Sequence, residues 1–303
     1  MKYVLITPAH NEEALIEKTL ASMVAQTQLP ERWIIVDDGS TDKTAEIVES
    51  YTPRYPWIEL VRRPEQLRRS FAGKVHAFNA GLEWAQQSLE FEVIGNLDAD
   101  LSFDPGYLEF LIGKFAEDLQ LGVAGTPFTE DGGYDTAQDS FEGENHVAGG
   151  CQLFRRQCFA DVGGYIPNPA GGIDWIAVTT ARMKGWRTRS FPQKRFHHHR
   201  TLGTAGKSRV AASFSYGEKD YYLGGSPVWQ LFRVAYRATK QPVEGLGLLA
   251  GYCWAAIRRI ERPVSGELMR FHRREQLKKL SGILRALLKF KKVDSFHLLT
   301  EWK

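Results

Sequence analysis

The first hundred residues of this chain alternate between short apolar runs and longer segments whose apolar residues recur at helical spacing. The runs lie at residues 3–7, 33–36, 57–61 and 91–97, and the helical segments include 12–26 and 74–89. Short runs rich in branched side chains are typical of buried strands. Strands that alternate with helices form a mostly parallel sheet with helices on both faces. We therefore expect an α/β fold built on a doubly wound, mostly parallel sheet.

Polar clusters follow three of these four runs. They are His10-Asn11-Glu12, Asp37-Asp38 and Asp98-Ala99-Asp100. Ligands bind at the carboxyl ends of the strands in a doubly wound sheet, which is where these clusters fall. A half-buried carboxylate without a partner costs stability, so three acidic strand ends indicate a binding site more than a need for solubility.

The sharpest of these signals is the pair Asp98 and Asp100. Two carboxylates two residues apart can converge on one hard cation, because Mg²⁺ and Mn²⁺ prefer oxygen ligands. Such a cation would bridge a diphosphate and neutralise charge on a leaving group. Two solvated aspartates in a loop are the alternative, but the position directly after an apolar strand favours the metal site.

Three further polar features are less specific. Asp37-Asp38 can accept hydrogen bonds from a base or a ribose, or form an ordinary turn before a helix. Lys74 can pair with a phosphate, or be an exposed lysine. The run His197-His198-His199 ends a predicted strand at 187–200. Neighbouring strand residues point to opposite faces, so not all three histidines can reach one site. At least one of them is expected to contact a metal or a phosphate, and a surface cluster is the alternative.

Several motifs in their order resemble the family 2 glycosyltransferases of the GT-A fold, of the type that synthesises bacterial polysaccharides and glycolipids. The segments that carry the resemblance are residues 6–13, 34–42, 73–81, 96–100, 149–156 and 162–165. The resemblance covers roughly residues 1–205. The chain has no Walker loop and no GxGxxG motif, which disfavours an NTPase or a dinucleotide-binding protein.

The resemblance implies roles for individual residues. The expected donor-binding residues are Pro8, Ala9, Glu12, Asp38, Lys74, Asp98 and Ala99. Glu12 would contact the ribose and Asp38 the uracil of a UDP-sugar; uridine is favoured by the resemblance alone. The expected ligands of Mn²⁺ or Mg²⁺ are Asp98, Asp100, His198 and His199.

The family's catalytic base lies in an acidic pair at the start of a helix. The matching stretch here is Gly171-Gly172-Ile173-Asp174-Trp175, in which Ile173 replaces the first acid. We therefore expect Asp174 to be the base. It would take a proton from an acceptor hydroxyl as that oxygen attacks the anomeric carbon, and a single displacement inverts the configuration. Donor and acceptor specificity is expected in the 126–150 loop and the 165–173 turn.

Two other functions remain open at this level. A nucleotidyltransferase also uses acidic metal sites, but it usually needs a glycine-rich, basic loop near the N-terminus, where this chain has Pro8-Ala9-His10-Asn11-Glu12. A non-catalytic scaffold in a membrane complex for glycan assembly is the second, and Asp98, Asp100 and Asp174 argue against it. A nucleic-acid partner is not expected, because the basic segment carries few interleaved aromatic residues.

The C-terminal part differs in composition from the rest, so we expect a catalytic domain at 1–224 and a basic, amphipathic helical tail at 225–303. Residues 258–303 hold 13 Lys/Arg against 5 Asp/Glu. Helices are expected at 228–239, 245–260 and 267–290. A short apolar core with aromatic and arginine neighbours suits a helix at an anionic membrane surface. Packing on the catalytic domain or on a second subunit is the alternative.

The expected location follows from the tail and the cysteines. Three cysteines without a pairing pattern fit a reducing compartment. The longest apolar stretch, near 243–257, is too short to span a bilayer comfortably. We therefore expect a cytoplasmic protein, peripheral on the inner face of the membrane, whose acceptor hydroxyl belongs to a lipid-linked or cell-surface glycan.

Overall fold

The computed structural model describes residues 1–64, 71–131, 136, 143–168, 171–200 and 209–289. The chain divides into two compact units, Met1–Arg200 and Thr201–Lys303. The first unit ends earlier than the expected 1–224, because helix α8 (Arg209–Tyr222) packs closely on α10 (Pro242–Ile257). Parts of the 126–150 loop and of the 165–173 turn, and the end of the basic tail, lie outside the described residues.

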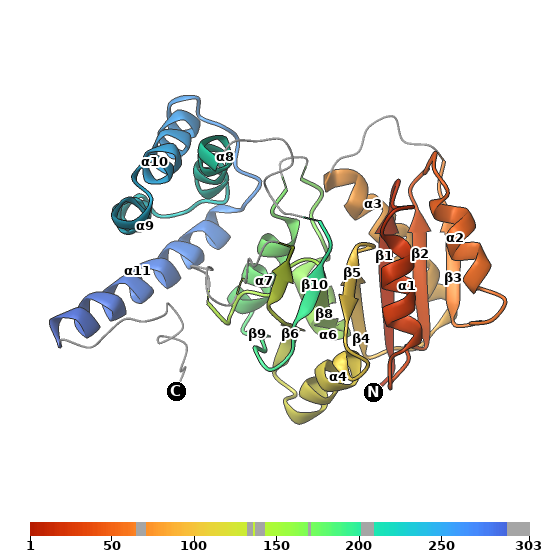
Figure 1. The fold of residues 1–303 in the computed structure, drawn as a ribbon. Coiled ribbons are helices and arrows are strands. Elements are labelled where there is room, and N and C mark those ends of the chain that lie inside the picture. Colours follow the sequence, from red (N-terminus) through yellow and green to blue (C-terminus); the bar gives the residue numbers. More distant parts are fainter. Residues whose placement is uncertain (65–70, 132–135, 137–142, 169–170, 201–208, 290–303) are drawn as a thin grey trace. The chain divides into compact units, whose positions relative to one another are not determined.

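A seven-stranded sheet forms the centre of the first unit (Figure 1). Its order is β3 (Ile58–Arg62), β2 (Arg32–Asp37), β1 (Tyr3–Ala9), β4 (Val93–Leu97), β8 (Cys151–Arg155), β6 (Leu121–Gly125) and β9 (Arg187–Ser190). All neighbouring pairs are parallel except those of β8, which runs antiparallel to β4 and β6. The expected α/β fold with a mostly parallel sheet is confirmed.

Helices cover both faces of this sheet, as the alternation along β1 requires. Tyr3 and Leu5 belong to one buried cluster, and Val4 and Ile6 to the other. The helices of the unit are α1 (Ile16–Val24), α2 (Thr44–Tyr51), α3 (Phe71–Ser88), α4 (Tyr107–Glu117), α6 (Arg156–Val162) and α7 (Ile173–Met183). The apolar residues of α1 and α4 pack on one face and those of α3, α6 and α7 on the other.

A small second sheet lies beside the ends of the main strands. It consists of β5 (Leu101–Phe103), β10 (Phe196–His198) and β7 (Phe128–Glu130), with β10 in the middle. The predicted strand at 187–200 is therefore wrong as one element, because β9 belongs to the main sheet and β10 to the small one. Helices α4 and α8 are not among the predicted elements.

One buried threonine ties this small sheet to α1. The Thr19 hydroxyl donates to the carbonyl of Leu101 at 2.8 Å and accepts from its N–H at 2.9 Å. Thr19 and Leu101 are both fully buried. Leu101 directly follows the Asp-Ala-Asp segment, so this pair of hydrogen bonds fixes the point where that segment enters β5.

The second unit consists of helices in its described part. They are α8, α9 (Pro227–Lys240), α10 and α11 (Gly266–Leu288). The contact of α8 with α10 is made at glycines: a Cβ on Gly217 would overlap the carbonyl of Leu248, and one on Gly251 the carbonyl of Phe214. Trp229 of α9 packs with Leu280 and Ile283 of α11.

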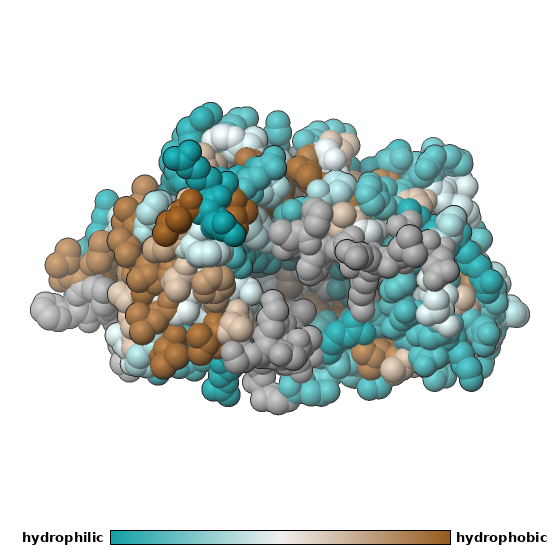
Figure 2. Space-filling model, turned by 90° about the horizontal axis from the view of Figure 1, so that it is seen from above, coloured by the Kyte–Doolittle hydropathy of each residue, from teal (hydrophilic) through white to brown (hydrophobic). Residues whose placement is uncertain are grey.

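The surface of this unit carries exposed apolar side chains (Figure 2). Leu246 and Ile257 on α10 are 65% and 76% exposed. No helix among the described residues combines the length and apolar composition that a membrane span requires.

The three cysteines should differ in reactivity. All three are free; Cys151 and Cys158 are buried and Cys253 is exposed. Burial raises the pKa of Cys151 and that of Cys158 to about 12 each. We expect a thiol reagent at neutral pH to modify one cysteine in the native protein and three in denaturant, measured by intact mass. Fast modification of two or more native thiols would contradict the placement of β8 and α6.

The Thr19 hydrogen bonds should be worth measurable stability. Thr19→Val keeps the shape of the side chain but leaves the N–H and the carbonyl of Leu101 without their buried partner, which should lower the free energy of unfolding by about 1–3 kcal/mol. Denaturant titration measures it. Thr52→Val is the matched control, because the Thr52 hydroxyl donates to the Glu49 carbonyl at an exposed position. Equal effects of both substitutions would contradict the role given to Thr19.

Candidate functional site

The site is built where β1, β2 and β4 end side by side. These strands are parallel neighbours, so their carboxyl ends meet at one edge of the sheet. Ala9 pairs in register with Asp37, and the Asp38 N–H donates to the Ala9 carbonyl at 2.8 Å. Pro8, the other predicted donor residue of β1, pairs with Val36. The polar clusters that follow these strands are thereby brought together, as predicted.

The loop after β1 directs Glu12 inward. Asn11 adopts a left-handed conformation with φ of 54°, which asparagine tolerates better than most residues. Its side-chain oxygen accepts from the Thr41 N–H at 2.8 Å, and the Glu12 N–H donates to the Thr44 hydroxyl at 2.7 Å. The Glu12 side chain is consequently buried beneath the site, 5% exposed.

Asp38, directly after β2, forms an ion pair with Arg63. Its carboxylate accepts from Arg63 at 2.5 Å, and its carbonyl lies 2.9 Å from His10 Nδ1. Burial raises the pKa of Asp38, and the charge of Arg63 acts against that rise. The predicted nucleoside residues Ala9, Glu12 and Asp38 therefore lie around one buried polar corner.

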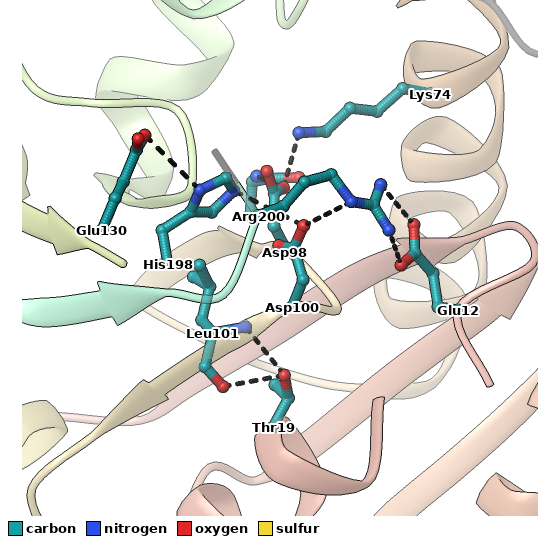
Figure 3. Close-up of polar contacts among 10 residues, drawn as sticks. Glu12, Thr19, Lys74, Asp98, Asp100, Leu101, Glu130, His198 and Arg200 are labelled. Carbon is teal, nitrogen blue, oxygen red and sulfur yellow. Dashed lines mark hydrogen bonds and ion pairs between the residues drawn. The ribbon is translucent and has the colours of Figure 1, made fainter. Parts of the chain in front are cut away.

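Asp98 is held by two donors from neighbouring elements. Lys74 Nζ on α3 and Asn96 Nδ2 on β4 donate to Asp98 Oδ1 at 2.5 and 3.0 Å (Figure 3). The structure thus brings Lys74 and Asp98 together, as the sequence analysis expects. Ala99, between the two aspartates, is buried, and its side chain is a single methyl group.

Asp100 lies deeper than Asp98 and meets two positive groups. Its Oδ2 is 3.4 Å from His198 Nε2 and 3.6 Å from Arg200 Nε (Figure 3). Burial raises the pKa of Asp100, but the hydrogen bond and charge of His198 with nearby cations outweigh it and lower the pKa. Asp100 Oδ1 is buried and has no hydrogen-bond partner among the described residues.

His198 comes from β10 and reaches the site because of the register of the small sheet. β10 pairs antiparallel with β5, which sets His198 opposite Leu101, the residue after Asp100. Its Nδ1 lies 3.8 Å from the buried carboxylate of Glu130 on β7. Burial lowers the pKa of His198, but the hydrogen bond with Asp100 and the charge of that residue outweigh burial and raise it.

The other two histidines of the run contact a different set of residues. His199 Nε2 lies 2.9 Å from the Ser102 hydroxyl, and His197 Nε2 lies 3.1 Å from Asp131. Atoms of Asp131, His197 and His199 lie within 4.8 Å of one another, so these three could also hold a cation. Of the predicted ligands His198 and His199, it is His198 whose ring pairs with Asp100.

Arg200 has a part in the site that the sequence analysis does not assign. Its guanidinium pairs with both oxygens of Glu12, at 3.2 and 2.5 Å, and approaches Asp100 (Figure 3). The sequence did contain a signal for Arg200: it lies two residues after the candidate ligand His198, and side chains two residues apart on a strand point to the same side. Arg63 and Glu130 carried no comparable signal, since they come from distant segments.

Asp174, the predicted base, lies in the first turn of α7. A Cβ placed on Gly149 would be 2.8 Å from the Asp174 Cβ and 3.0 Å from its Oδ2. The Gly149 carbonyl in turn accepts from Asn96 Nδ2, the group that also donates to Asp98. Asp174 therefore lies beside the end of β4, one residue layer from the aspartate pair. Ile173, in place of the first acid, is buried.

The donor set at Asp100 and His198 fits a divalent cation. A buried carboxylate oxygen without a partner, an imidazole nitrogen on the other oxygen and a second carboxylate two residues away are groups that Mn²⁺ and Mg²⁺ accept. Glu130 lies 3.8 Å from His198 Nδ1, so its carboxylate adds negative charge beside the ring without a hydrogen bond.

Comparison with known proteins agrees with this geometry. A model of Glycosyl transferase family 2 matches residues 4–146. The dodecaprenyl-phosphate galacturonate synthase of Rhizobium johnstonii is 38% identical over 107 residues, which are 33% of this chain and 28% of that protein. The matches span 28%, 28% and 36% of the first three curated relatives.

Solved structures share the fold over nearly the whole chain. A mannosyltransferase from Pyrobaculum calidifontis in complex with GDP-Man and Mn²⁺ is 20% identical with a TM-score of 0.58, covering 97% of this chain and 84% of that one. TarS 1-349 of S. aureus in complex with UDP-GlcNAc is 17% identical with a TM-score of 0.55, covering 98% and 88%. We conclude that residues 4–146 match glycosyl transferase family 2 and that the chain has the GT-A fold.

Proposed function

We propose that this protein transfers a sugar from a nucleoside-diphosphate sugar to an acceptor hydroxyl, with inversion and with the help of a divalent cation. The observation that carries the proposal is Asp100, a buried carboxylate with one oxygen on His198 and the other without a hydrogen-bond partner among the residues that the structure describes. A buried carboxylate oxygen without a hydrogen-bond partner does not stabilise the fold, and a bound cation would supply the missing partner.

The donor would lie across the ends of β1, β2 and β4. Ala9, Glu12 and Asp38 would hold the nucleoside, and Asp98, with Lys74 beside it, the ribose or the diphosphate. Asp100 and His198 would hold Mn²⁺ or Mg²⁺, which when bound neutralises charge on the departing diphosphate. The group of Asp131, His197 and His199 is less suited to this role, because Asp131 is exposed and Lys18 Nζ lies 3.5 Å from His199.

Asp174 is the proposed base. It lies next to Gly149 in the first turn of α7. An ionised carboxylate there would take the acceptor's proton during attack, and no covalent sugar intermediate is required. The acceptor and the sugar are not chosen by this geometry, and the fold occurs in proteins bound to GDP-Man and to UDP-GlcNAc.

The donor can be named by hydrolysis. A panel of UDP- and GDP-sugars is incubated with the protein, with and without Mn²⁺, and the released nucleotide is measured. We expect slow, metal-dependent release from one donor, lowered on the order of 100-fold or more in Asp100→Asn and in Asp174→Asn. The two variants should differ in binding: Asp174→Asn keeps Mn²⁺-dependent nucleotide binding by calorimetry, and Asp100→Asn loses it.

Asp161→Asn is the matched control, since Asp161 is exposed on α6 and contacts Gln157 and Trp186. It should behave like the unmodified protein. If no sugar nucleotide is bound or hydrolysed, with or without Mn²⁺ and vesicles, the transferase proposal fails and a scaffold role takes its place.

We further propose that the second unit binds an anionic membrane surface. The exposed apolar residues of α10 recur on one side of the helix, at Val243, Leu246, Trp254 and Ile257. Arg258 lies over the Trp254 ring at 5.0 Å, and further basic residues follow. Exposed apolar side chains bordered by cations are the composition of an interfacial helix. A lipid-linked acceptor would then be presented at the same surface.

Vesicle flotation tests the membrane proposal. The full chain should float with vesicles that contain phosphatidylglycerol, and the double variant Leu246→Glu/Ile257→Glu should not, because it places charges in the apolar face. Leu119→Glu is the control: Leu119 is 75% exposed but lies in the first unit. Equal flotation of all three proteins contradicts the proposal. Loss of self-association without any lipid binding would instead assign the face to a second subunit.

A further inference from the structure

Arg200 neutralises two buried carboxylates at once. Its Nη atoms bind both oxygens of Glu12, and its Nε lies 3.6 Å from Asp100 Oδ2. The two carboxylates are nearly inaccessible to solvent, whereas Arg200 itself is 37% exposed. The partly exposed guanidinium of Arg200 thus lies next to both buried carboxylates (Figure 3).

This position conflicts with a bound donor and its metal. Glu12 is the proposed ribose contact and Asp100 the proposed metal ligand, and Arg200 occupies both. A guanidinium cannot lose its proton to relieve repulsion from a second cation. A divalent ion on Asp100 would therefore be repelled by Arg200 at its present distance, and the ribose would have to replace Arg200 on Glu12.

We propose that Arg200 is the resident counter-ion of the donor site, and that it leaves Asp100 and Glu12 for the donor's diphosphate when the divalent cation binds. This inference rests on the proposed function. The guanidinium fork matches two phosphate oxygens as well as it matches the two oxygens of Glu12. In the bound state Asp100 exchanges Arg200 for the divalent cation and Glu12 exchanges it for the ribose hydroxyls, so neither buried carboxylate is left without a partner.

The proposed exchange predicts that one substitution changes the affinity for Mn²⁺ and the affinity for the nucleotide in opposite directions. Arg200→Ala removes a competitor of the metal, so Mn²⁺ alone should bind about tenfold more tightly than to the unmodified protein. The same variant lacks the diphosphate contact, so UDP or GDP in saturating Mn²⁺ should bind about tenfold more weakly. A salt bridge that serves only folding would not give the tighter Mn²⁺ binding, because its loss loosens the metal ligands and weakens the binding of both Mn²⁺ and the nucleotide.

The measurements use the full chain. Free Mn²⁺ is followed by electron paramagnetic resonance, and nucleotide binding by calorimetry. Arg187→Ala is the matched control, since Arg187 forms an ion pair with Asp118 at the far edge of the sheet and the charge change is the same. Thermal unfolding adds a second readout: Arg200→Ala should melt at a lower temperature than the unmodified protein without Mn²⁺, and Mn²⁺ should raise its melting temperature more.

Mn²⁺ affinity that is unchanged or lower in Arg200→Ala overturns the inference, as does undetectable Mn²⁺ binding by both proteins. Tighter Mn²⁺ binding with unchanged nucleotide affinity overturns the transfer to the diphosphate. The double variant Arg200→Ala/Asp100→Asn separates these failures from those of the proposed function. If it still binds Mn²⁺ tightly, the metal does not use Asp100 and the proposed metal site fails, whatever Arg200 does.

Discussion

Negative charge buried at the ends of parallel strands is the constraint on which the site of this protein depends. Glu12, Asp38 and Asp100 are almost excluded from solvent, and each meets a basic side chain: Arg200, Arg63 and His198. A buried carboxylate is tolerated only with such partners. Since paired charges in a fold are often neutral or unfavourable for stability, their concentration at one sheet edge is better explained by a ligand than by folding.

The carboxylates of this arrangement could be predicted from the sequence, as could Lys74 and His198, whereas Arg63 and Arg200 were not predicted. Glu12, Asp38 and Asp98 each follow an apolar run within a few residues, and parallel strands bring such positions together. Arg63 directly follows β3, and Arg200 shares the strand period of His198, but no local pattern shows which carboxylates these two arginines meet. Their pairing depends on tertiary structure, which the spacing of residues along the chain does not contain.

The run of three histidines shows the same limit of prediction from the sequence. Strand alternation separates His198 from His197 and His199, but it does not say which of the two sets faces Asp100. The pairing of β10 with β5 decides that question in favour of His198. Helix α8 is a different case: its buried residues are Ser213, Gly217 and Tyr222, so few apolar side chains mark its buried face. The domain boundary expected at residue 224 follows α8, whereas the compact units divide after Arg200.

The reversal of β8 explains how residues from distant segments meet the aspartate pair. Because β8 runs antiparallel to β4, its first residue, Cys151, lies opposite Leu97, and the Gly150 carbonyl accepts from the Asp98 N–H. Gly149 and Gly150 therefore lie at the site, where a Cβ would be 2.8 Å from Asp174 on one glycine and 3.1 Å from the Phe196 ring on the other. With no side chains at these two positions, α7 can bring the proposed base to the end of β4, and β10 can bring His198. A parallel strand in place of β8 would end at this edge instead of beginning there, and the glycine pair would lie at the opposite edge of the sheet.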